Sequence, residues 1–424
     1  MGGIAFIQSP AVLARDALSS RLKTMVSKSV AVCIIDENLP VPADPRVWRE
    51  AKALSEAGYK VSIICPKGRG FENRHETLEG VEIYRHRSWD GSTPLGYLLE
   101  YAWALSIEFV LALKVYSRTR FRILQACNPP DTIFLIALFF KLFGVRFVFD
   151  HHDLTPELCA VRFPRKRLLY HLARLAEWMS FHVADVTLAT NDTFREIAVT
   201  RGGVSPEHNF VVRTCPDLKD FPLQPARPEL KEGRKHVVVY VGTMGSQDGI
   251  DLLLESISYL THVKGRRDTL FALIGPGSEL DRLKAQAGAH GLDGYVKFTG
   301  PLYGDDLRAY LATASVGVAP DPSNEFNDKL TMIKIFEYMA YGMPVVLYDL
   351  PEGRRSADGA ALYAQGNDPI DFAEKIGHLL DSESSRRQLG AIGREQIVAS
   401  LNWGIEKQRL LKAYNAAFSA PVQP

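Results

Sequence analysis

Short runs of hydrophobic residues recur along the chain, each followed by small or polar residues and then by a segment with helical spacing. Residues 29–35 form such a run, which predicts a buried strand. Asp44 followed by Pro45 marks the start of a helix that ends at Gly58, and a second strand is predicted at 59–66. This order of strand, helix and strand is typical of a parallel sheet covered by helices.

The same alternation continues through two halves of the chain. Further strands are predicted at 121–127, 146–149, 186–190 and 211–212, and helices at 95–117, 130–143, 164–183 and 193–201. Residues 220–236 contain three prolines among charged residues, which is the composition of an interdomain linker. A second α/β domain is predicted to begin at 236. A final helix that contains Trp403 and Tyr414 is expected to pack back on the first domain.

The predicted strands of the second domain all end in small or turn-forming residues. These strands are 236–241, 271–274, 296–298 and 316–319. In open parallel sheets ligands bind at the carboxyl ends of the strands, so these loops should converge on one crevice. Two of the loops, 242–249 and 275–277, are rich in glycine, and their backbone N–H groups suit a diphosphate.

Neither glycine loop has the spacing of the dinucleotide fingerprint or of the Walker loop, which disfavours a dehydrogenase or an ATPase. The alternative for each loop taken alone is a turn that needs glycine for its geometry and binds nothing.

One carboxylate in the second domain lies on a predicted amphipathic helix. Asn327 and Asp328 are expected to cap this helix, and Gly342 ends it. Glu337 falls between two aromatic residues, so we expect it to be partly buried and to need hydrogen-bond donors. The vicinal hydroxyls of a ribose would supply two. The alternative is an exposed pair with Lys334 one turn earlier.

Ionisable side chains follow a buried strand of the first domain in the run Asp150-His151-His152-Asp153. Two histidines beside two aspartates could bind a metal. Adjacent residues in a turn diverge, however, and the sequence shows no third cluster of ligands. We therefore predict no metal site, and expect one histidine to contact a substrate hydroxyl or phosphate while the other is satisfied by the backbone.

Length and composition agree with this organisation. A chain of 424 residues exceeds what one hydrophobic core usually serves, which predicts two domains. The net charge of +1 argues against nucleic acid as a partner. The five cysteines are scattered and without CxxC spacing, which argues against a zinc site and a disulfide framework and favours a reducing cytoplasm.

Membrane signals are weak but present. Residues 1–28 mix apolar and basic residues without the unbroken apolar run of a secretion signal, and Met25 is an alternative start. The longest apolar run, 133–140, is too short to span a bilayer. Basic residues stand beside apolar ones in the first domain: Arg118, Arg120, Arg122, Arg162, Arg165, Lys166, Arg167 and Arg174. They suggest contact with anionic lipid, the alternative being a solvated helix face.

Taken together, these features resemble the GT-B glycosyltransferases, specifically retaining glycosyltransferase family 4. The resemblance covers nearly all of 29–418 and rests on five segments: 44–51, 149–157, 240–244, 274–277 and 336–346. It implies an α/β fold of two Rossmann-like, parallel-sheet domains that face a central crevice. It also implies transfer of a sugar from a nucleotide diphosphate sugar to a hydroxyl, with retention, and without a metal or another cofactor.

The resemblance also divides the chain. It implies an N-terminal extension at 1–28, an acceptor-side domain at 29–219, a linker at 220–235, a nucleotide-sugar-binding domain at 236–402 and a returning helix at 403–418.

The resemblance assigns roles to individual residues. Glu337 would hold the donor ribose, and His152 would lie at the sugar. The diphosphate would lie at Gly242, Thr243, Met244, Gly245, Gly275 and Gly277, and the base near Thr299 and Leu302. The acceptor would use the first domain around Asp44, Arg46, Asp150 and Asp153.

Three positions depart from the family pattern. The family usually has a second glutamate eight positions before Glu337, where this chain has Lys329. It often has an arginine and a lysine for the diphosphate, where this chain has Thr243 and Asp248. Lys329 and Lys334, with Thr331 and the start of the helix, are our candidates to meet the diphosphate charge as it develops. The predicted catalytic residues are thus His152, Glu337 and Lys329.

We expect a cytoplasmic enzyme of surface polysaccharide or glycolipid assembly, at the inner face of the cytoplasmic membrane. Its acceptor would be a saccharide or a lipid-linked sugar. Two alternatives stay open: a nucleotide-sugar epimerase of the same fold, and an inactive GT-B subunit that binds a partner enzyme. The sequence does not specify the base, the sugar, the linkage or the oligomeric state.

Overall fold

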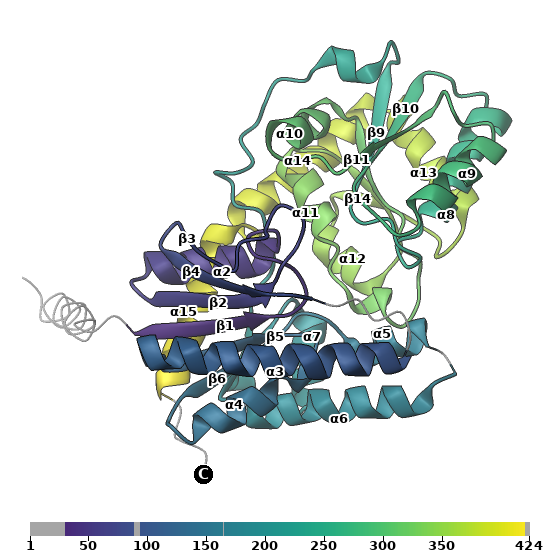
Figure 1. The fold of residues 1–424 in the computed structure, drawn as a ribbon. Coiled ribbons are helices and arrows are strands. Elements are labelled where there is room, and N and C mark those ends of the chain that lie inside the picture. The colour runs from purple at the N-terminus through teal and green to yellow at the C-terminus, as the bar shows by residue number, and fades with distance from the viewer. Residues whose placement is uncertain (1–29, 89–93, 164, 420–424) are drawn as a thin grey trace, which may run out of the picture.

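The computed structural model describes residues 30–88, 94–163 and 165–419, and it contains two α/β domains that face each other (Figure 1). The extension expected at 1–28 lies outside the described residues. Both sheets are mostly parallel and covered by helices, so the predicted fold class is confirmed.

The first domain is built on an eight-stranded sheet in the order β3-β4-β2-β1-β5-β6-β7-β8. Its strands are β1 (Ala31–Asp36), β2 (Lys60–Pro66), β3 (His75–Leu78), β4 (Val81–His86), β5 (Ile123–Cys127), β6 (Arg146–His151), β7 (Val186–Ala189) and β8 (Asn209–Val211). Only the edge pair of β3 and β4 is antiparallel. Every residue of β1 is buried, as expected for a strand covered on both faces.

Helices cover both faces of this sheet. They are α2 (Pro45–Glu56), α3 (Pro94–Thr119), α4 (Phe134–Lys141), α5 (Thr155–Arg162), α6 (Arg167–Val183) and α7 (Asp192–Thr200), with short 3-10 turns at Asp131–Ile133 and Pro206–His208. One buried cluster joins the sheet to α3 and α4, and another joins its opposite face to α2. The long helices α3 and α6 run side by side along one side of the domain (Figure 1).

The second domain has a six-stranded parallel sheet in the order β11-β10-β9-β12-β13-β14. Its strands are β9 (His236–Val241), β10 (Thr269–Ile274), β11 (Val296–Gly300), β12 (Val316–Ala319), β13 (Val345–Tyr348) and β14 (Ala361–Ala364). Its helices are α8 (Ile250–Ser258), α9 (Leu280–Ala289), α10 (Gly304–Thr313), α11 (Ile333–Ala340), α12 (Pro351–Ala357), α13 (Pro369–Asp381) and α14 (Glu383–Ala399). Short helical turns lie at Pro228–Lys231, Tyr259–Val263 and Asn327–Lys329.

The start of α11 differs from the prediction. Asn327 and Asp328 do not cap it, because they lie in a separate 3-10 turn. The Asn327 amide donates to the carbonyls of Gln247 (3.1 Å) and Pro322 (2.9 Å), so it holds loops together instead. The helix begins only at Ile333, without a side-chain cap.

The last helix, α15 (Trp403–Ser419), leaves the second domain and packs on the first. Leu410, Ala413 and Tyr414 are buried in the core cluster that contains β1 and β2 residues. The chain therefore crosses between the domains twice, and the crossings touch: the Trp403 N–H donates to the Pro216 carbonyl at 3.0 Å. Among the helices of the described ranges, none has the length and apolar character needed to cross a membrane.

Candidate functional site

A cavity of about 270 Å³ lies between the two domains. The first domain lines it with the turn before α2, with the loop after β6 and with Thr190 and Thr214. The second domain contributes Thr331, Ile333 and Phe336, at and just before the start of α11. A crevice between the two domains therefore exists, and its walls come from the strand ends of the first domain and from the α11 region of the second. The glycine loops at 242–249 and 275–277, which were expected to converge on it, do not line it.

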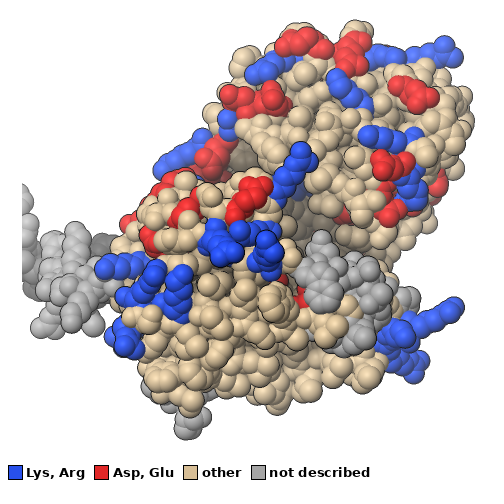
Figure 2. All heavy atoms as spheres, viewed as in Figure 1, with Lys and Arg blue, Asp and Glu red and all other residues tan. Residues whose placement is uncertain are grey.

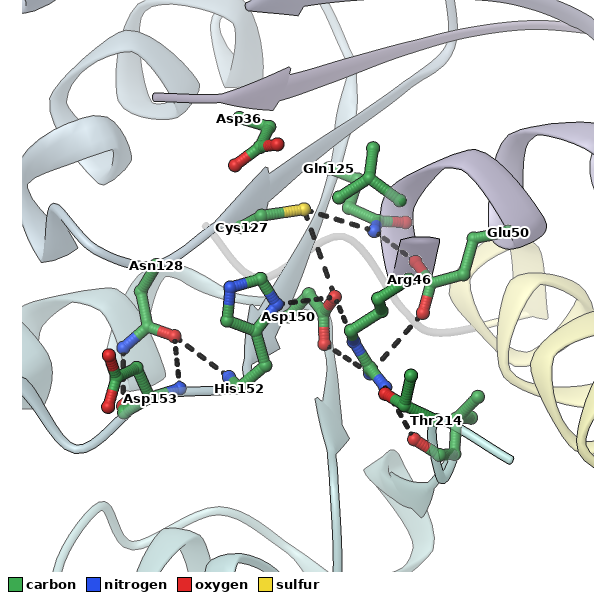
Figure 3. Close-up of polar contacts among 12 residues, drawn as sticks. Asp36, Arg46, Glu50, Gln125, Cys127, Asn128, Asp150, His152, Asp153 and Thr214 are labelled. Carbon is green, nitrogen blue, oxygen red and sulfur yellow. Dashed lines mark hydrogen bonds and ion pairs between the residues drawn. The ribbon is translucent and has the colours of Figure 1, made fainter. Parts of the chain in front are cut away.

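The loop after β6 is fixed by one amide. Asn128 follows the neighbouring strand β5, and its Oδ1 accepts from the N–H groups of His152 (2.8 Å) and Asp153 (3.0 Å). Its Nδ2 donates to the Asp153 carbonyl at 2.7 Å. Because the amide holds both sides of the turn, the His152 ring is presented to the cavity from a defined position (Figure 3).

His152 is held in its charged form by a buried carboxylate. Its Nδ1 lies 3.5 Å from Asp150 Oδ2. Burial disfavours the charged ring, but the hydrogen bond and the charge of Asp150 outweigh it and raise the pKa of His152 to about 9. A donor that is cationic at neutral pH therefore borders the cavity.

Asp150 is itself clamped by Arg46. The Arg46 guanidinium donates Nε to Asp150 Oδ2 (2.9 Å) and a terminal nitrogen to Oδ1 (2.6 Å). Burial alone would raise the pKa of Asp150, but Arg46 and His152 hold it well below its usual range. Asp150 is fully buried, so it positions its neighbours and cannot meet an acceptor directly, in contrast to the acceptor-side role expected of it.

The clamp extends to the C-terminal helix. Glu50 lies 3.3 Å from Arg46 and accepts from the Gln125 amide at 2.7 Å, and Gln125 in turn accepts from the Tyr414 hydroxyl. Burial and the nearby Asp150 raise the pKa of Glu50 to about 7, although Arg46 opposes the shift. The helix α15 thus supports the site from behind.

The two adjacent histidines point to different partners. His151 is buried, and its Nε2 lies 3.4 Å from Glu177 on α6, whereas His152 faces Asp150. Cys127, Asp150 and His152 do bring three potential ligand atoms within 4.8 Å. However, burial raises the pKa of the Cys127 thiol, and Arg46 already supplies the positive charge beside Asp150. This set is poorly suited to a cation.

A second potential ligand set joins Glu37, His86 and Glu108, outside the cavity lining. His86 Nε2 lies 2.9 Å from Glu37 and 3.9 Å from Glu108, so the three side chains already contact one another.

The glycine loops of the second domain pack on each other. A Cβ at Gly275 would lie 1.9 Å from the Gly242 carbonyl oxygen, and one at Gly277 would lie 2.2 Å from that of Met244. The Met244 N–H donates to the Pro276 carbonyl at 2.8 Å. At Gly275 and Gly277, therefore, glycine is required for loop-to-loop contact, whether or not a diphosphate also binds there.

Lys334 is the cation beside the first glycine loop. Its Nζ lies 2.9 Å and 3.0 Å from the two Asp321 oxygens and 4.8 Å from the centre of the Tyr240 ring. A Cβ at Gly242 would lie 3.3 Å from Lys334 Cε. Asp248, at the position where the family often has a cation, folds back to accept from the Gly245 N–H at 2.7 Å.

Glu337 is half-buried on α11, next to Phe336 of the cavity wall. Burial raises the pKa of its carboxyl to about 6, against the opposing charges of Arg49 and Lys334. Within residues 30–88, 94–163 and 165–419, the structure records no hydrogen bond or ion pair to this carboxylate. A carboxylate in this setting is open to a ligand with hydroxyl donors.

Lys329 and Thr331 bridge the domains. Lys329 Nζ lies 3.0 Å from Glu157 of α5, and Asn191 of the first domain donates to the Lys329 carbonyl (2.9 Å) and to the Thr331 hydroxyl (3.1 Å). Phe326 joins this contact in a small apolar cluster with first-domain residues. The Lys329 charge is thus engaged by the first domain rather than by the glycine loops.

The remaining predicted residues keep modest local roles. Asp44 caps α2 through the N–H groups of Arg46 (2.8 Å) and Val47 (2.9 Å), and Asp44, Arg46 and Asp153 border the cavity. The Thr299 hydroxyl donates to the Gly300 carbonyl at 2.8 Å. Leu302 packs against the second-domain core, and the ring of the following residue, Tyr303, is 78% exposed.

Sequence reasoning missed Asn128, Asn191 and Gln125. For Asn128 a signal was present, since Asn128-Pro129-Pro130 directly follows the buried run 121–127. For the other two residues, no local pattern separates them from ordinary polar positions.

Comparison with known families divides the chain in the same way as the fold. Residues 43–215 match the family described as "Glycosyl transferase 4-like domain", and residues 235–382 match "Glycosyl transferases group 1".

Several characterised proteins are similar over longer stretches. The MMP alpha-(1->4)-mannosyltransferase of Mycolicibacterium hassiacum is 26% identical over 63% of this chain and 64% of its own length. This chain thus aligns with a little under two thirds of that relative. The phosphatidyl-myo-inositol mannosyltransferase of Propionibacterium freudenreichii is 26% identical over 70% of each chain. The sulfoquinovosyl transferase SQD2 of Arabidopsis thaliana is 23% identical over 87% of this chain and 69% of its own.

Solved structures share the fold. The sucrose-phosphate synthase of Thermosynechococcus elongatus superposes with a TM-score of 0.76 at 17% identity, covering 92% of this chain and all of that chain. WaaG, a glycosyltransferase involved in lipopolysaccharide biosynthesis, superposes with a TM-score of 0.67 at 14% identity, covering 90% and 98%. The family matches and the shared architecture identify the chain as a member of the group 1 glycosyl transferases with the GT-B fold.

Proposed function

We propose that the protein transfers a sugar from a nucleotide diphosphate sugar to an acceptor hydroxyl in the interdomain cavity, with retention and without a metal. The observation that carries the proposal is the pairing of a charged His152 on one wall with a half-buried, unpartnered Glu337 beside the other. Retention is an inference from the family. Related proteins support the class of reaction, since several of them are mannosyltransferases or sulfoquinovosyl transferases by name.

The donor is assigned to the second domain. Glu337 accepts hydrogen bonds from the ribose hydroxyls, and the loop at 242–245 faces the diphosphate. Lys334 lies against Gly242, so its ammonium group is placed to stabilise the negative charge that develops on the leaving diphosphate. This cation supplies the electrostatic role that a metal would otherwise fill. The base is assigned to the loop with Thr299 and Leu302, where Tyr303 offers an exposed ring.

The acceptor is assigned to the first domain. His152 donates to the transferred sugar, while Asp44 and Asp153 border the side from which the acceptor enters. Arg46 and Asp150 act as positioning residues, because they fix the charge and the orientation of the His152 ring. Lys329 would join the donor only if its ion pair with Glu157 opened.

The product is assigned to surface polysaccharide or glycolipid assembly, at the cytoplasmic face of a membrane. One relative is by its name a phosphatidyl-myo-inositol mannosyltransferase, and a structural neighbour is involved in lipopolysaccharide biosynthesis. The side of the first domain formed by α3 and α6 shows few charged side chains at its centre, with basic ones at its left-hand and right-hand edges (Figure 2). Leu168 of α6 is 71% exposed there, which favours lipid contact over a fully solvated face.

The donor site is tested by calorimetric titration with UDP and with GDP. We expect selective binding of one nucleotide, weakened about tenfold or more by Glu337→Gln, since a carboxylate accepts two charge-assisted bonds that an amide cannot replace. Glu255→Gln on α8 is the matched control, because that glutamate is exposed and does not line the interdomain cavity. Equal affinity of the Glu337→Gln variant and the wild type would contradict the assignment.

The reaction is tested by product analysis with and without an acceptor. Transfer requires the acceptor, whereas conversion of the donor sugar in its absence would mark an epimerase. Nucleotide binding without either product would point to an inactive binding subunit.

A further inference from the structure

A second cavity, of about 180 Å³, lies within the first domain between α3, α5 and α6. Most of its wall is apolar, with Leu158, Phe163, Leu169, Leu172 and Ala176 among the lining residues. An apolar cavity of about 150 Å³ already accepts a benzene-sized group. This cavity therefore has room for a short length of hydrocarbon chain.

Part of the wall of this cavity is formed by loops that follow β5 and β6, next to the functional site. Pro129, Pro130 and Asp131 line it, and they directly follow Asn128, the residue that holds the backbone of His152 and Asp153. Thr155 also lines it, two residues beyond Asp153, which borders the interdomain cavity. The two cavities thus lie on either side of the same pair of loops.

Exposed apolar side chains lie on two of the helices that line this cavity, α3 and α6. On α6, Leu168, Leu172, Leu175 and Trp178 are exposed at spacings of three and four residues, which places them on one face of the helix. Leu99 and Trp103 are exposed on the adjacent α3. An apolar stripe with exposed tryptophans is typical of a surface that contacts the interface of a membrane.

Basic residues lie at one end of this stripe. Arg165, Lys166 and Arg167 are exposed at the start of α6, and the only acidic residue of α6, Glu177, is buried against Arg201. The exposed charge of this helix is therefore basic, which is complementary to phosphate groups.

We propose that the cavity between α3, α5 and α6 binds the hydrocarbon chain of an anionic, lipid-linked acceptor. The phosphate of the acceptor lies at the basic residues that begin α6, and its sugar reaches His152 past the shared loops. This inference rests on the proposed function, because it names the acceptor of the same cleft. It makes the exposed stripe the route by which the chain leaves the bilayer.

The test uses decyl phosphate as a probe, with inorganic phosphate as the comparison. The full-length protein is expected to bind decyl phosphate and to bind inorganic phosphate about tenfold or more weakly, since each buried methylene contributes to affinity. Ala176→Phe fills the cavity and should weaken decyl phosphate binding about tenfold. Ala102→Phe adds the same ring to an exposed position of α3 outside the cavity and should leave it unchanged.

Binding of UDP is measured on every variant. Retained UDP affinity shows that Ala176→Phe is folded; if it is not, Ala173→Phe fills the same cavity. The inference would be overturned if the filled variant bound decyl phosphate as tightly as the wild type does. It would also be overturned if the wild type bound inorganic phosphate as tightly as decyl phosphate. Absence of binding of both UDP and GDP by the wild type would instead count against the proposed function, and the decyl phosphate comparison would still test the cavity.

A second readout uses phosphatidylcholine vesicles with and without phosphatidylglycerol. Brominated chains should quench the fluorescence of Trp103 and Trp178 only in the anionic vesicles. Quenching that is equal in neutral vesicles would contradict the role given to the basic residues.

Discussion

The two walls of the interdomain cavity are built in different ways. On the first domain, His152 rests on Asp150, Asp150 on Arg46, and Arg46 is linked to Glu50, so each ionisable group has a charged partner. On the second domain, Glu337 has no such partner among the described residues, and the glycine loops contact mainly each other.

The groups on the first domain are thus held in place before any ligand binds, whereas the carboxylate on the second domain is left to bind one. A network of buried charges is expensive to assemble and stays in place only if every partner is present. It suits a group that must be held in one protonation state and one orientation. An unpartnered carboxylate has the opposite property, since its hydrogen bonds remain to be made by a ligand. Substitutions on the first wall should therefore act on stability and rate, and substitutions on the second wall on nucleotide affinity.

The largest effect is expected from Arg46→Met. The change leaves Asp150 and Glu50 buried without their cation, which should cost about 3–5 kcal/mol of unfolding free energy. Urea unfolding followed by fluorescence measures it. Arg118→Met, at an exposed position near the end of α3, is the control and should stay within about 0.5 kcal/mol of wild type. A similar loss of unfolding free energy in both variants would mean that the buried charge network stabilises the fold no more than an exposed arginine does.

Next in size is the effect of His152→Ala on turnover. Removal of a preorganised donor at the reacting sugar should lower kcat about 100-fold. Nucleotide affinity should change little, because His152 belongs to the first domain, whereas the glycine loops belong to the second domain and do not line the cavity. Steady-state transfer kinetics measure the effect on kcat, and a UDP titration measures the effect on nucleotide affinity. His262→Ala, at an exposed position of the second domain outside the cavity lining, is the control. A parallel loss of UDP affinity would place His152 in the donor site instead.

The pH dependence of UDP binding should show whether Glu337 binds the nucleotide in its charged form. Burial raises the pKa of Glu337 to about 6, so its carboxyl is neutral below that pH and charged above it. Since the charged form accepts the stronger hydrogen bonds, affinity should rise several-fold as the pH increases through about 6. Titrations between about pH 5 and pH 8 test this. In the Glu337→Gln variant, UDP affinity should rise with pH only as far as the ionisation of UDP itself requires. An identical rise in both proteins would show that the titration of Glu337 does not contribute to it.

The smallest expected effect comes from Asp321→Asn. This carboxylate pairs with Lys334, and its neutralisation leaves the lysine charge for the diphosphate. UDP affinity should improve about threefold, by ordinary Coulomb attraction in a partly buried site, while uridine affinity stays constant. Asp349→Asn, whose surface carboxylate pairs with Arg354, is the control. An equal gain for uridine would show that the change acts on the pocket in general and not on the phosphates.

Much of the fold could be predicted because buried parallel strands are continuous apolar runs. The strand at 29–35 is an example, and the observed β1 differs from it by one or two residues at each end. The hairpin of β3 and β4 was missed because His75–Leu78 is a short edge strand with alternating exposure and charged residues. The start of α11 was misplaced because Asn327 binds distant carbonyls that no local pattern reveals.

The positions of two candidate residues could be predicted from local sequence, because His152 follows a strand and Glu337 lies on an amphipathic helix. Their functional roles remain predictions. The network that supports the site could not be predicted in this way. Arg46 meets Asp150 across 104 positions of sequence, Glu50 meets Gln125 across 75, and Gln125 meets Tyr414 across 289. Such pairs are set by the order of strands in the sheet and by the return of the last helix, and neither can be inferred from the spacing of residue types along the chain.

The last helix, α15, follows the second domain in sequence but packs in the core of the first domain. A protease cut within residues 220–235 would break only one of the two crossings, and the second half would still hold its last helix in the first-domain core. Two fragments that meet in this segment, produced separately, should therefore reassemble into one particle. The buried Tyr414, whose hydroxyl donates to Gln125, would then lie in the contact through which the two fragments bind each other.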